Sequence, residues 1–200
     1  MLRPAHIGHL ALLRSLIREA ARDGAFDAEL ARESPAADRF FTELRQALKT
    51  GYFVVNDAKT GTLQTVAVPG YVYWADDEAG GAPPVGFGLF RAVDDGYELW
   101  LAGLEASLRG RGHGRAMLKA LFATDTGRKT RFMRVRSAAR YAKAITHLLA
   151  EHGFTPTRET HNETWFVRTG VPAPSRREPG ASAGSGAIVS TSGLPPARTS

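Results

Sequence analysis

The sequence contains no cysteine, so disulfides, thiolate metal sites and a cysteine nucleophile are all excluded. It also has no apolar run approaching the ~18 residues that a membrane-spanning helix needs. Arginine and histidine interrupt the N-terminal stretch MLRPAHIGHLALLRSLIREAARD too often for the apolar core of a signal peptide. We therefore expect a cytoplasmic protein that does not interact with membranes.

Acidic residues are almost missing from residues 109–143, where Asp125 stands alone against eleven lysines and arginines. This segment carries a formal charge of +10, whereas the whole chain carries +6. A local field of this size suits a polyanion such as a nucleotide, a phosphorylated cofactor or a nucleic acid. A solvated basic surface is the alternative that charge alone leaves open.

Motifs for metal binding and for serine hydrolysis are absent as well. Six histidines are present, and His6 and His9 lie one helical turn apart, but no HExxH or other ligand set accompanies them. No GxSxG segment provides a nucleophile elbow. We expect no metal site.

Aromatic residues are missing from the last thirty positions, 171–200, and twenty-two of those thirty are Gly, Pro, Ser, Thr or Ala. Such a segment cannot bury enough apolar surface to offset the entropy lost on ordering. The composition predicts a folded domain over residues 1–170 and a disordered tail over 171–200.

Within the domain, hydrophobic periodicity predicts helices first, then β-structure, then alternating helices and strands. Asp38 is the predicted N-cap of the second helix, and the turn Asp94-Asp95-Gly96 predicts a tight hairpin. The predicted helices are 6–22, a segment after Asp38, a segment after Gly114, and 140–152; the clearest predicted strands are 85–93, 97–104, 131–137 and 164–168. This order predicts an α+β or mixed α/β arrangement.

The stretch RGRGHGRAML, residues 109–118, places three glycines among basic residues immediately before an apolar helical pattern. A helix N-terminus presents four unpaired N–H groups, and preceding glycines let a ligand approach the backbone and permit positive φ. A pyrophosphate fits such a site. The spacing is GxGxG, so it matches neither a P-loop nor a dinucleotide-binding fingerprint. An Arg-Gly nucleic-acid segment would lack the apolar helix that follows.

Arg109 to Gly114 resembles the [QR]xxGx[GA] pyrophosphate loop of the GNAT superfamily of acyl-CoA N-acyltransferases. YELWLAGL, VGFGLFRAV and RFMRVRS are similar to strands four, three and five of that family, and LLAEHGF is similar to its "LYEKLGF" helix end. The resemblance covers roughly residues 1–169. It implies a GNAT-like α+β fold: a central, mostly antiparallel mixed sheet with splayed fourth and fifth strands, flanked by about four helices.

The resemblance also implies acetyl-CoA as co-substrate. The residues that would hold its pyrophosphate are Arg109, Gly110, Arg111, Gly112, His113, Gly114 and Arg115. Its pantetheine arm would lie along Gly103, Leu104 and Glu105, where a backbone N–H would polarise the thioester carbonyl. Pre-organised donors of this kind contribute about 3 kcal/mol each to transition-state stabilisation.

Transfer to an amine requires a base and, in many family members, an acid. Glu98, eleven residues before Arg109, is the expected base, with Glu105 as a second candidate. The family's usual tyrosine is replaced here by Leu149, and a frequent asparagine by Ala142. Tyr141 is our candidate acid; Ser137 and His147 are alternatives, and the thiolate can also leave without an acid.

The acceptor is an amine of a small molecule or of a protein, which the sequence does not specify. Tyr71, Tyr73 and Trp74, beside the acids 76–78, could hold a cationic amine; an extra hairpin is the alternative interpretation of 62–84. Phe40, Phe41 and Tyr52 are candidates for lining the acceptor groove or for the core. The alternative functions are a catalytically silent CoA-binding module and a nucleic-acid-binding protein. The resemblance also implies a homodimer, because members of the family are often dimers.

Overall fold

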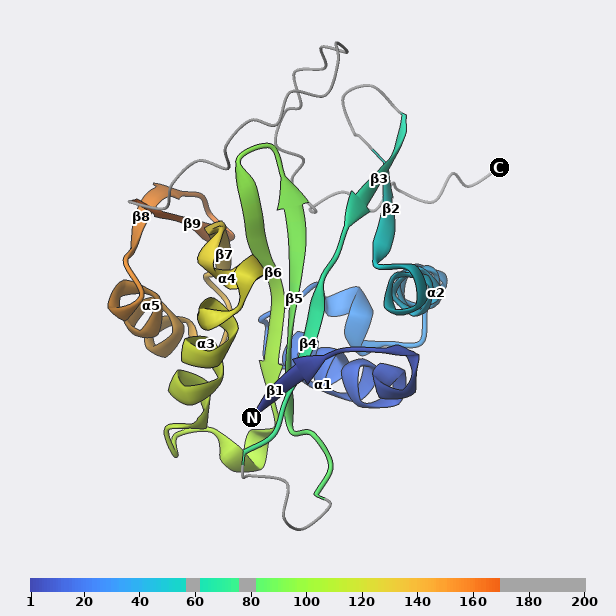
Figure 1. Cartoon of the computed structure of the whole chain (residues 1–200), viewed down its shortest axis with the longest axis horizontal. Helices are drawn as coiled ribbons and strands as arrows, with labels where there is room; N and C mark the ends of the chain where they lie inside the picture. Colours follow the sequence, from blue (N-terminus) through green and yellow to red (C-terminus); the bar gives the residue numbers. More distant parts are fainter. Residues whose placement is uncertain (57–61, 76–81, 170–200) are drawn as a thin grey trace.

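The computed structural model describes residues 1–56, 62–75 and 82–169 (Figure 1). The predicted tail and the acids at 76–78 lie outside these residues. The helices are α1 (Leu10–Arg22), α2 (Pro35–Thr50), α3 (His113–Ala123), α4 (Asp125–Arg128) and α5 (Ala142–Glu151), with 3₁₀ turns η1 (Ile7–His9), η2 (Ala28–Ala31) and η3 (Ala106–Leu108). The strands are β1 (Leu2–Pro4), β2 (Tyr52–Asn56), β3 (Leu63–Ala67), β4 (Gly70–Tyr73), β5 (Gly86–Val93), β6 (Gly96–Leu104), β7 (Thr130–Arg136), β8 (Phe154–Glu159) and β9 (Glu163–Arg168).

The α+β prediction is confirmed. Seven strands form one sheet in the order β1-β4-β5-β6-β7-β9-β8, and all neighbours are antiparallel except β6 and β7. Strands β2 and β3 form a separate antiparallel pair, of which only β3 lies in the 62–84 segment where an extra hairpin was the alternative interpretation. The short edge strand β1 and the strand β8, which contains Pro156, were not predicted.

The prediction that Asp38 caps the second helix is wrong, because α2 begins one turn earlier. Ser34 is the N-cap: its hydroxyl accepts a hydrogen bond from the Ala37 N–H at 3.2 Å. Pro35 occupies the first turn, where the missing N–H costs nothing. Asp38 instead places a negative charge in the first turn, near the positive end of the helix dipole.

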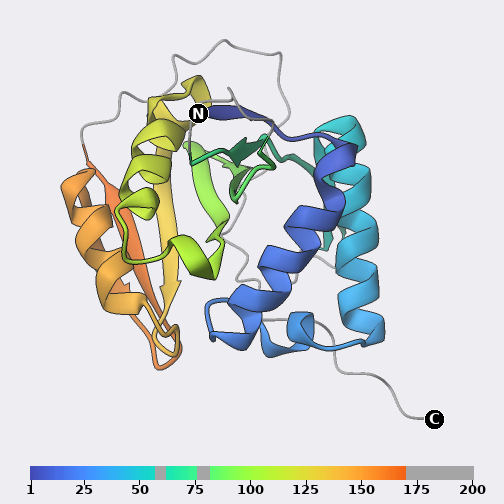
Figure 2. The ribbon, with the colours of Figure 1, turned by 90° about the horizontal axis from the view of Figure 1, so that it is seen from below.

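Helices cover both faces of the sheet (Figure 2). On one side, α1 and α2 contribute Leu13, Ile17 and Leu44 to a core that also contains Phe87 of β5. On the other side, α3 and α5 contribute Leu121 and Leu149 to a second core, which includes Phe154 and Phe166 of β8 and β9. The sheet therefore separates two apolar cores.

The parallel strands β6 and β7 separate along their length. They pair at Tyr97 with Thr130, at Glu98 with Phe132 and at Leu99 with Met133. Beyond that point β6 runs on to Leu104 and β7 to Arg136 with no rung between them. Trp100 is an extra residue opposite β5, a bulge at the place where the two strands part. This confirms the predicted splay of the segments 97–104 and 131–137.

Within residues 1–56, 62–75 and 82–169, no helix is both long enough and apolar enough to cross a membrane.

Candidate cofactor cleft

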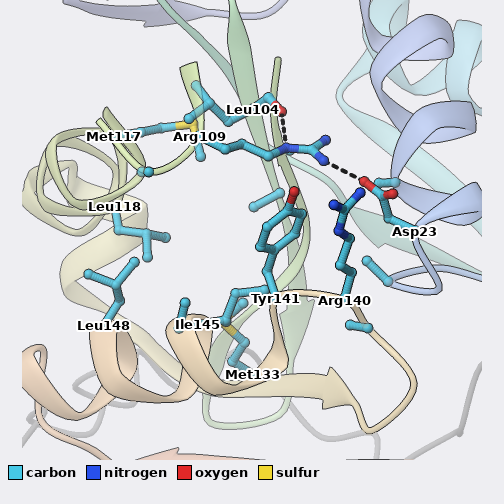
Figure 3. Close-up of a pocket in the computed structure, with 18 residues that line it drawn as sticks. Asp23, Leu104, Arg109, Met117, Leu118, Met133, Arg140, Tyr141, Ile145 and Leu148 are labelled. Carbon is cyan, nitrogen blue, oxygen red and sulfur yellow. Dashed lines mark hydrogen bonds and ion pairs between the residues drawn. The ribbon is translucent and has the colours of Figure 1, made fainter. Parts of the chain in front are cut away.

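A cavity of about 210 Å³ occupies the gap between β6 and β7. Residues from the end of β6, from Met133 of β7, and from α3 and α5 line it. The end of α1 and the loop that follows it close one side (Figure 3). Most of the lining is apolar: Ala20, Ala25, Ala102, Leu104, Met117, Leu118, Met133, Ala139, Ala144, Ile145 and Leu148. The charged lining residues are Asp23, Arg109 and Arg140, and Tyr141 lies beside the two arginines.

The glycine-rich loop lies at the mouth of this cavity. Gly110 and Gly112 have φ values of 75° and 85°, the left-handed conformation that glycine adopts without strain. The first hydrogen bond of α3 runs from the Ala116 N–H to the Gly112 carbonyl at 3.1 Å, so the N–H groups of residues 112–115 precede the helical ladder. Gly110 and Gly114 line the cavity directly. The loop thus has the backbone geometry of an anion site.

The basic side chains of the loop have different surroundings. Arg111 is exposed, and His113 is half-buried. Arg115 makes a bidentate ion pair with Glu151 of α5, at 2.9 Å from Nε and 2.6 Å from the terminal nitrogen. Hydrogen bonding to Arg115 lowers the pKa of Glu151 and, in return, raises that of Arg115. The Arg115 side chain therefore ties α3 to α5, and its backbone remains part of the loop.

Arg109 points away from the loop, toward α1. Its Nε donates to the Leu104 carbonyl at 3.0 Å, one terminal nitrogen donates to Glu19 at 2.8 Å, and the other pairs with Asp23 (Figure 3). Burial lowers the pKa of this guanidinium, but hydrogen bonds with Asp23 and Tyr141 and the nearby Glu19 raise it by more. The assignment of Arg109 to the pyrophosphate stays a prediction. Its partners Glu19 and Asp23, one helical turn apart, were not identified from the sequence.

The predicted pantetheine strand lies partly in the cavity. Gly103 and Leu104 line it. Glu105 is exposed, its N–H donates to the Val85 carbonyl at 2.9 Å, and its carboxylate accepts a hydrogen bond from Ser107 at 3.1 Å. The role of Glu105, as cofactor contact or as base, stays a prediction, and the observed contacts give it no support.

Glu98 is buried between two arginines. One carboxylate oxygen pairs with Arg91 of β5, and the other accepts from Nε of Arg134 of β7 at 2.7 Å. Glu98 is 4% exposed and does not belong to the cavity lining. Its predicted role as base stays untested. Arg91 and Arg134 were not identified from the sequence, although each lies on a strand that neighbours β6.

Among the three candidate acids, Tyr141 lines the cavity, and Ser137 and His147 do not. Tyr141 is the N-cap residue of α5, and its ring lies under the guanidinium groups of Arg109 and Arg140, at 5.2 and 5.5 Å. His147 is exposed, 3.3 Å from Glu151. Leu149, at the position of the family's tyrosine, is fully buried in the second core. An acid at that position would not face the cavity in this chain.

The aromatic residues proposed for the acceptor do not line the cavity. Tyr73 and Trp74 are buried, and the Trp74 indole donates to the Ala82 carbonyl at 3.0 Å. Phe40 and Phe41 belong to the core beneath α1 and α2, and Tyr52 is exposed on the β2–β3 hairpin. Ala20, Asp23 and Ala25, at the end of α1 and just after it, line the cavity and were not identified from the sequence.

No family model matches the sequence, and no curated protein matches it. Solved structures do: the chain has the fold of GNAT-family acetyltransferases. PaiA N-acetyltransferase from Thermoplasma acidophilum, in complex with coenzyme A, is 13% identical, with a TM-score of 0.55 over 84% of this chain and 97% of its own. YncA from Salmonella typhimurium, with its cofactor acetyl-CoA, is 20% identical, with a TM-score of 0.55 over 87% and 96%. The ribosomal-protein-S18-alanine N-acetyltransferase from Escherichia coli is 15% identical, with a TM-score of 0.52 over 88% and 96%.

Proposed function

We propose that this protein is an N-acetyltransferase that uses acetyl-CoA and transfers the acetyl group directly to an amine held in the same complex. One observation carries the proposal: a glycine-rich loop at a helix N-terminus lies at the mouth of a cavity that opens between two splayed parallel strands. The fold it shares with structures that contain coenzyme A or acetyl-CoA supports the same function.

The residues fit a long, largely apolar ligand with an anionic end. The N–H groups of residues 110–115 would hold the diphosphate, since helix N-termini bind such groups. The unpaired length of β6, at Gly103 and Leu104, would hold the pantetheine arm. The apolar lining excludes water, which strengthens any hydrogen bond made to the thioester oxygen inside.

When bound, acetyl-CoA supplies an activated acyl group. On that group the nitrogen of a neutral amine would replace the sulfur at the acyl carbon, so one proton would have to leave the amine and one would have to reach the departing sulfur. We infer that Tyr141 donates a proton to the departing sulfur, because its phenol lines the cavity beside Arg109. Water or a carboxylate then receives the proton released by the amine.

Two assays test the proposal in sequence. Isothermal titration with acetyl-CoA should show binding. The absence of any heat of binding at millimolar acetyl-CoA would contradict the proposal. Coenzyme A release is then followed with a thiol reagent and a panel of small amines, lysine peptides and free protein N-termini. We expect turnover with one class of amine, and Tyr141→Phe should lower kcat by about tenfold to a hundredfold, with an unchanged acetyl-CoA Kd.

A catalytically silent CoA-binding module is the second candidate, because the buried Leu149 replaces the family's usual tyrosine. It predicts acetyl-CoA binding with no thiol release for any amine.

The nucleic-acid alternative receives less support from the structure. Arg109, Arg115 and Arg134, three of the basic residues that suggested it, are ion-paired within the protein.

A further inference from the structure

A buried cluster of charges lies beside the cavity and plays no part in the mechanism above. Arg91, Glu98 and Arg134 come from the three neighbouring strands β5, β6 and β7, and their side chains are 10%, 5% and 9% exposed. Removing charged groups from water is costly, so a cluster of this kind persists only where its geometry is good. The sequence did not predict this cluster, because Glu98 was considered there without its two arginine partners.

The two ion pairs of the cluster are not equivalent. Arg91 and Glu98 are direct partners in the β5–β6 ladder, which has eight paired positions and holds together without them. Glu98 and Arg134 connect β6 to β7, which share three paired positions. Arg134 is the first residue of β7 after the last of these, Met133. The Glu98–Arg134 pair therefore lies where the two strands separate.

Aromatic side chains cover both guanidinium groups. The Arg91 guanidinium lies over the ring of Trp100 at 5.8 Å, and that of Arg134 lies over Trp165 at 5.0 Å. Trp100 is the bulge residue of β6, so the point where β6 departs from regular pairing is packed directly against the cluster. Ion pairs shielded from water in this way are stronger and more directional than exposed ones.

We propose that Glu98 and Arg134 form a clamp that fixes the point at which β6 and β7 part, and thereby the width of the cofactor gap. Both are then positioning residues. This proposal rests on the proposed function, because it assigns Glu98 a part in acetyl-CoA binding. It follows from the contacts of Glu98: both carboxylate oxygens are held by arginines, and the residue lies outside the cavity lining.

The sharpest test compares Arg134→Met with Arg91→Met. Each variant removes one arginine and leaves Glu98 with the other, so the two are matched in chemistry and in burial. We expect both variants to have lower thermal stability than wild type. Arg134→Met should also raise the acetyl-CoA Kd by about tenfold or more, whereas the Kd of Arg91→Met should stay within about twofold of the wild-type value. Equal effects of the two variants on Kd, or no effect of either, would overturn the clamp.

A second variant separates the clamp from the alternative that Glu98 is the catalytic base. For Glu98→Gln the clamp predicts weaker acetyl-CoA binding, while the acidic limb of the pH profile of kcat is retained. A base predicts the reverse: unchanged Kd, and loss of kcat together with the acidic limb. That second result would reject the clamp.

If Arg134→Met does not fold, Arg134→Lys can replace it, because lysine retains the charge with a shorter reach. Arg134→Lys should then raise the acetyl-CoA Kd relative to Arg91→Lys.

Failure of the proposed function would be visible separately, because wild-type protein would then not bind acetyl-CoA. The clamp is still testable in that case by hydrogen exchange without ligand. Arg134→Met should speed exchange at the β6–β7 rungs, residues 97–99 and 130–133, more than Arg91→Met does. Equal exchange in the two variants would reject the clamp whatever ligand the cavity takes.

Discussion

Glycines in two regions of this molecule serve opposite purposes. In the loop before α3, Gly110 and Gly112 have positive φ, and a Cβ added at either would meet no atom within 4 Å. In the sheet and at α4, a Cβ on Gly88 would lie 2.7 Å from Leu121, and one on Gly127 would lie 1.9 Å from the Leu121 carbonyl oxygen. The buried glycines allow the protein to pack against itself. The loop glycines leave space that the protein does not fill, which is the property expected of a binding surface.

The largest effect is expected at Gly127. Its added Cβ would also lie 2.6 Å from the Phe122 Cα. Both obstacles are backbone atoms of α3, so the substitution would have to displace the backbone itself. Gly127→Ala should destabilise the protein by about 4 kcal/mol or more, or prevent folding altogether. Urea unfolding followed by circular dichroism measures this. A loss below about 1 kcal/mol would contradict the close contact of Gly127 with the backbone of Leu121 and Phe122.

Gly88→Ala should have a smaller effect, because its obstacle is the flexible end of a side chain. The added methyl group would contact both terminal carbons of Leu121, which can shift at the expense of core packing. We expect a loss of about 1–3 kcal/mol in the free energy of unfolding. Leu121→Val in the same chain should recover part of it, and strict additivity of the two substitutions would contradict the contact.

Gly112→Ala and Gly51→Ala form a matched pair. Gly51 ends α2 with a φ of 79° and equally open surroundings, but it lies outside the glycine-rich loop. Each substitution should cost about 1–2 kcal/mol through left-handed strain. Acetyl-CoA titrations should separate them, with Kd raised about tenfold or more for Gly112→Ala and unchanged for Gly51→Ala. Equal affinities would mean that the loop is merely a turn.

The smallest effect is expected at Gly114. This residue lies in the first turn of α3 without positive φ, and an added Cβ would touch only Leu148, at 4.0 Å. Gly114→Ala should therefore stabilise the protein by about 0.5–1 kcal/mol, because alanine has less conformational freedom to lose. Thermal melts measure this. A lower melting temperature for Gly114→Ala would contradict the open surroundings of this residue.

The sequence predicted those features that depend on local pattern. Glycine spacing before an apolar helix predicted the loop at 109–115, the tight turn at Asp94-Asp95-Gly96 predicted β5 and β6, and alternation predicted β7. Features that depend on distant partners could not be predicted. The contacts of Arg109 with Glu19 and Asp23, and of Glu98 with Arg91 and Arg134, join residues that the fold alone brings together.

Residue type alone was ambiguous at positions where the same side chain suits two different environments. Trp74 beside acids suggested a cation site, yet its indole is buried against Ala82. Asp38 is a good capping residue, but the Ser34-Pro35 pair before it begins the helix. Ser34 and Asp38 are both residue types that cap helices, and the helix begins at the earlier of the two.

One comparison of affinities tests the central claim most directly: acetyl-CoA against S-acetylpantetheine, which lacks the diphosphate and the adenosine 3′-phosphate, titrated into wild type and into Gly112→Leu. If the amides of residues 110–115 hold a diphosphate, wild type should prefer acetyl-CoA by about a hundredfold or more, and the variant should lose most of that preference. Equal binding of the two ligands by wild type, or an undiminished preference in Gly112→Leu, would contradict it.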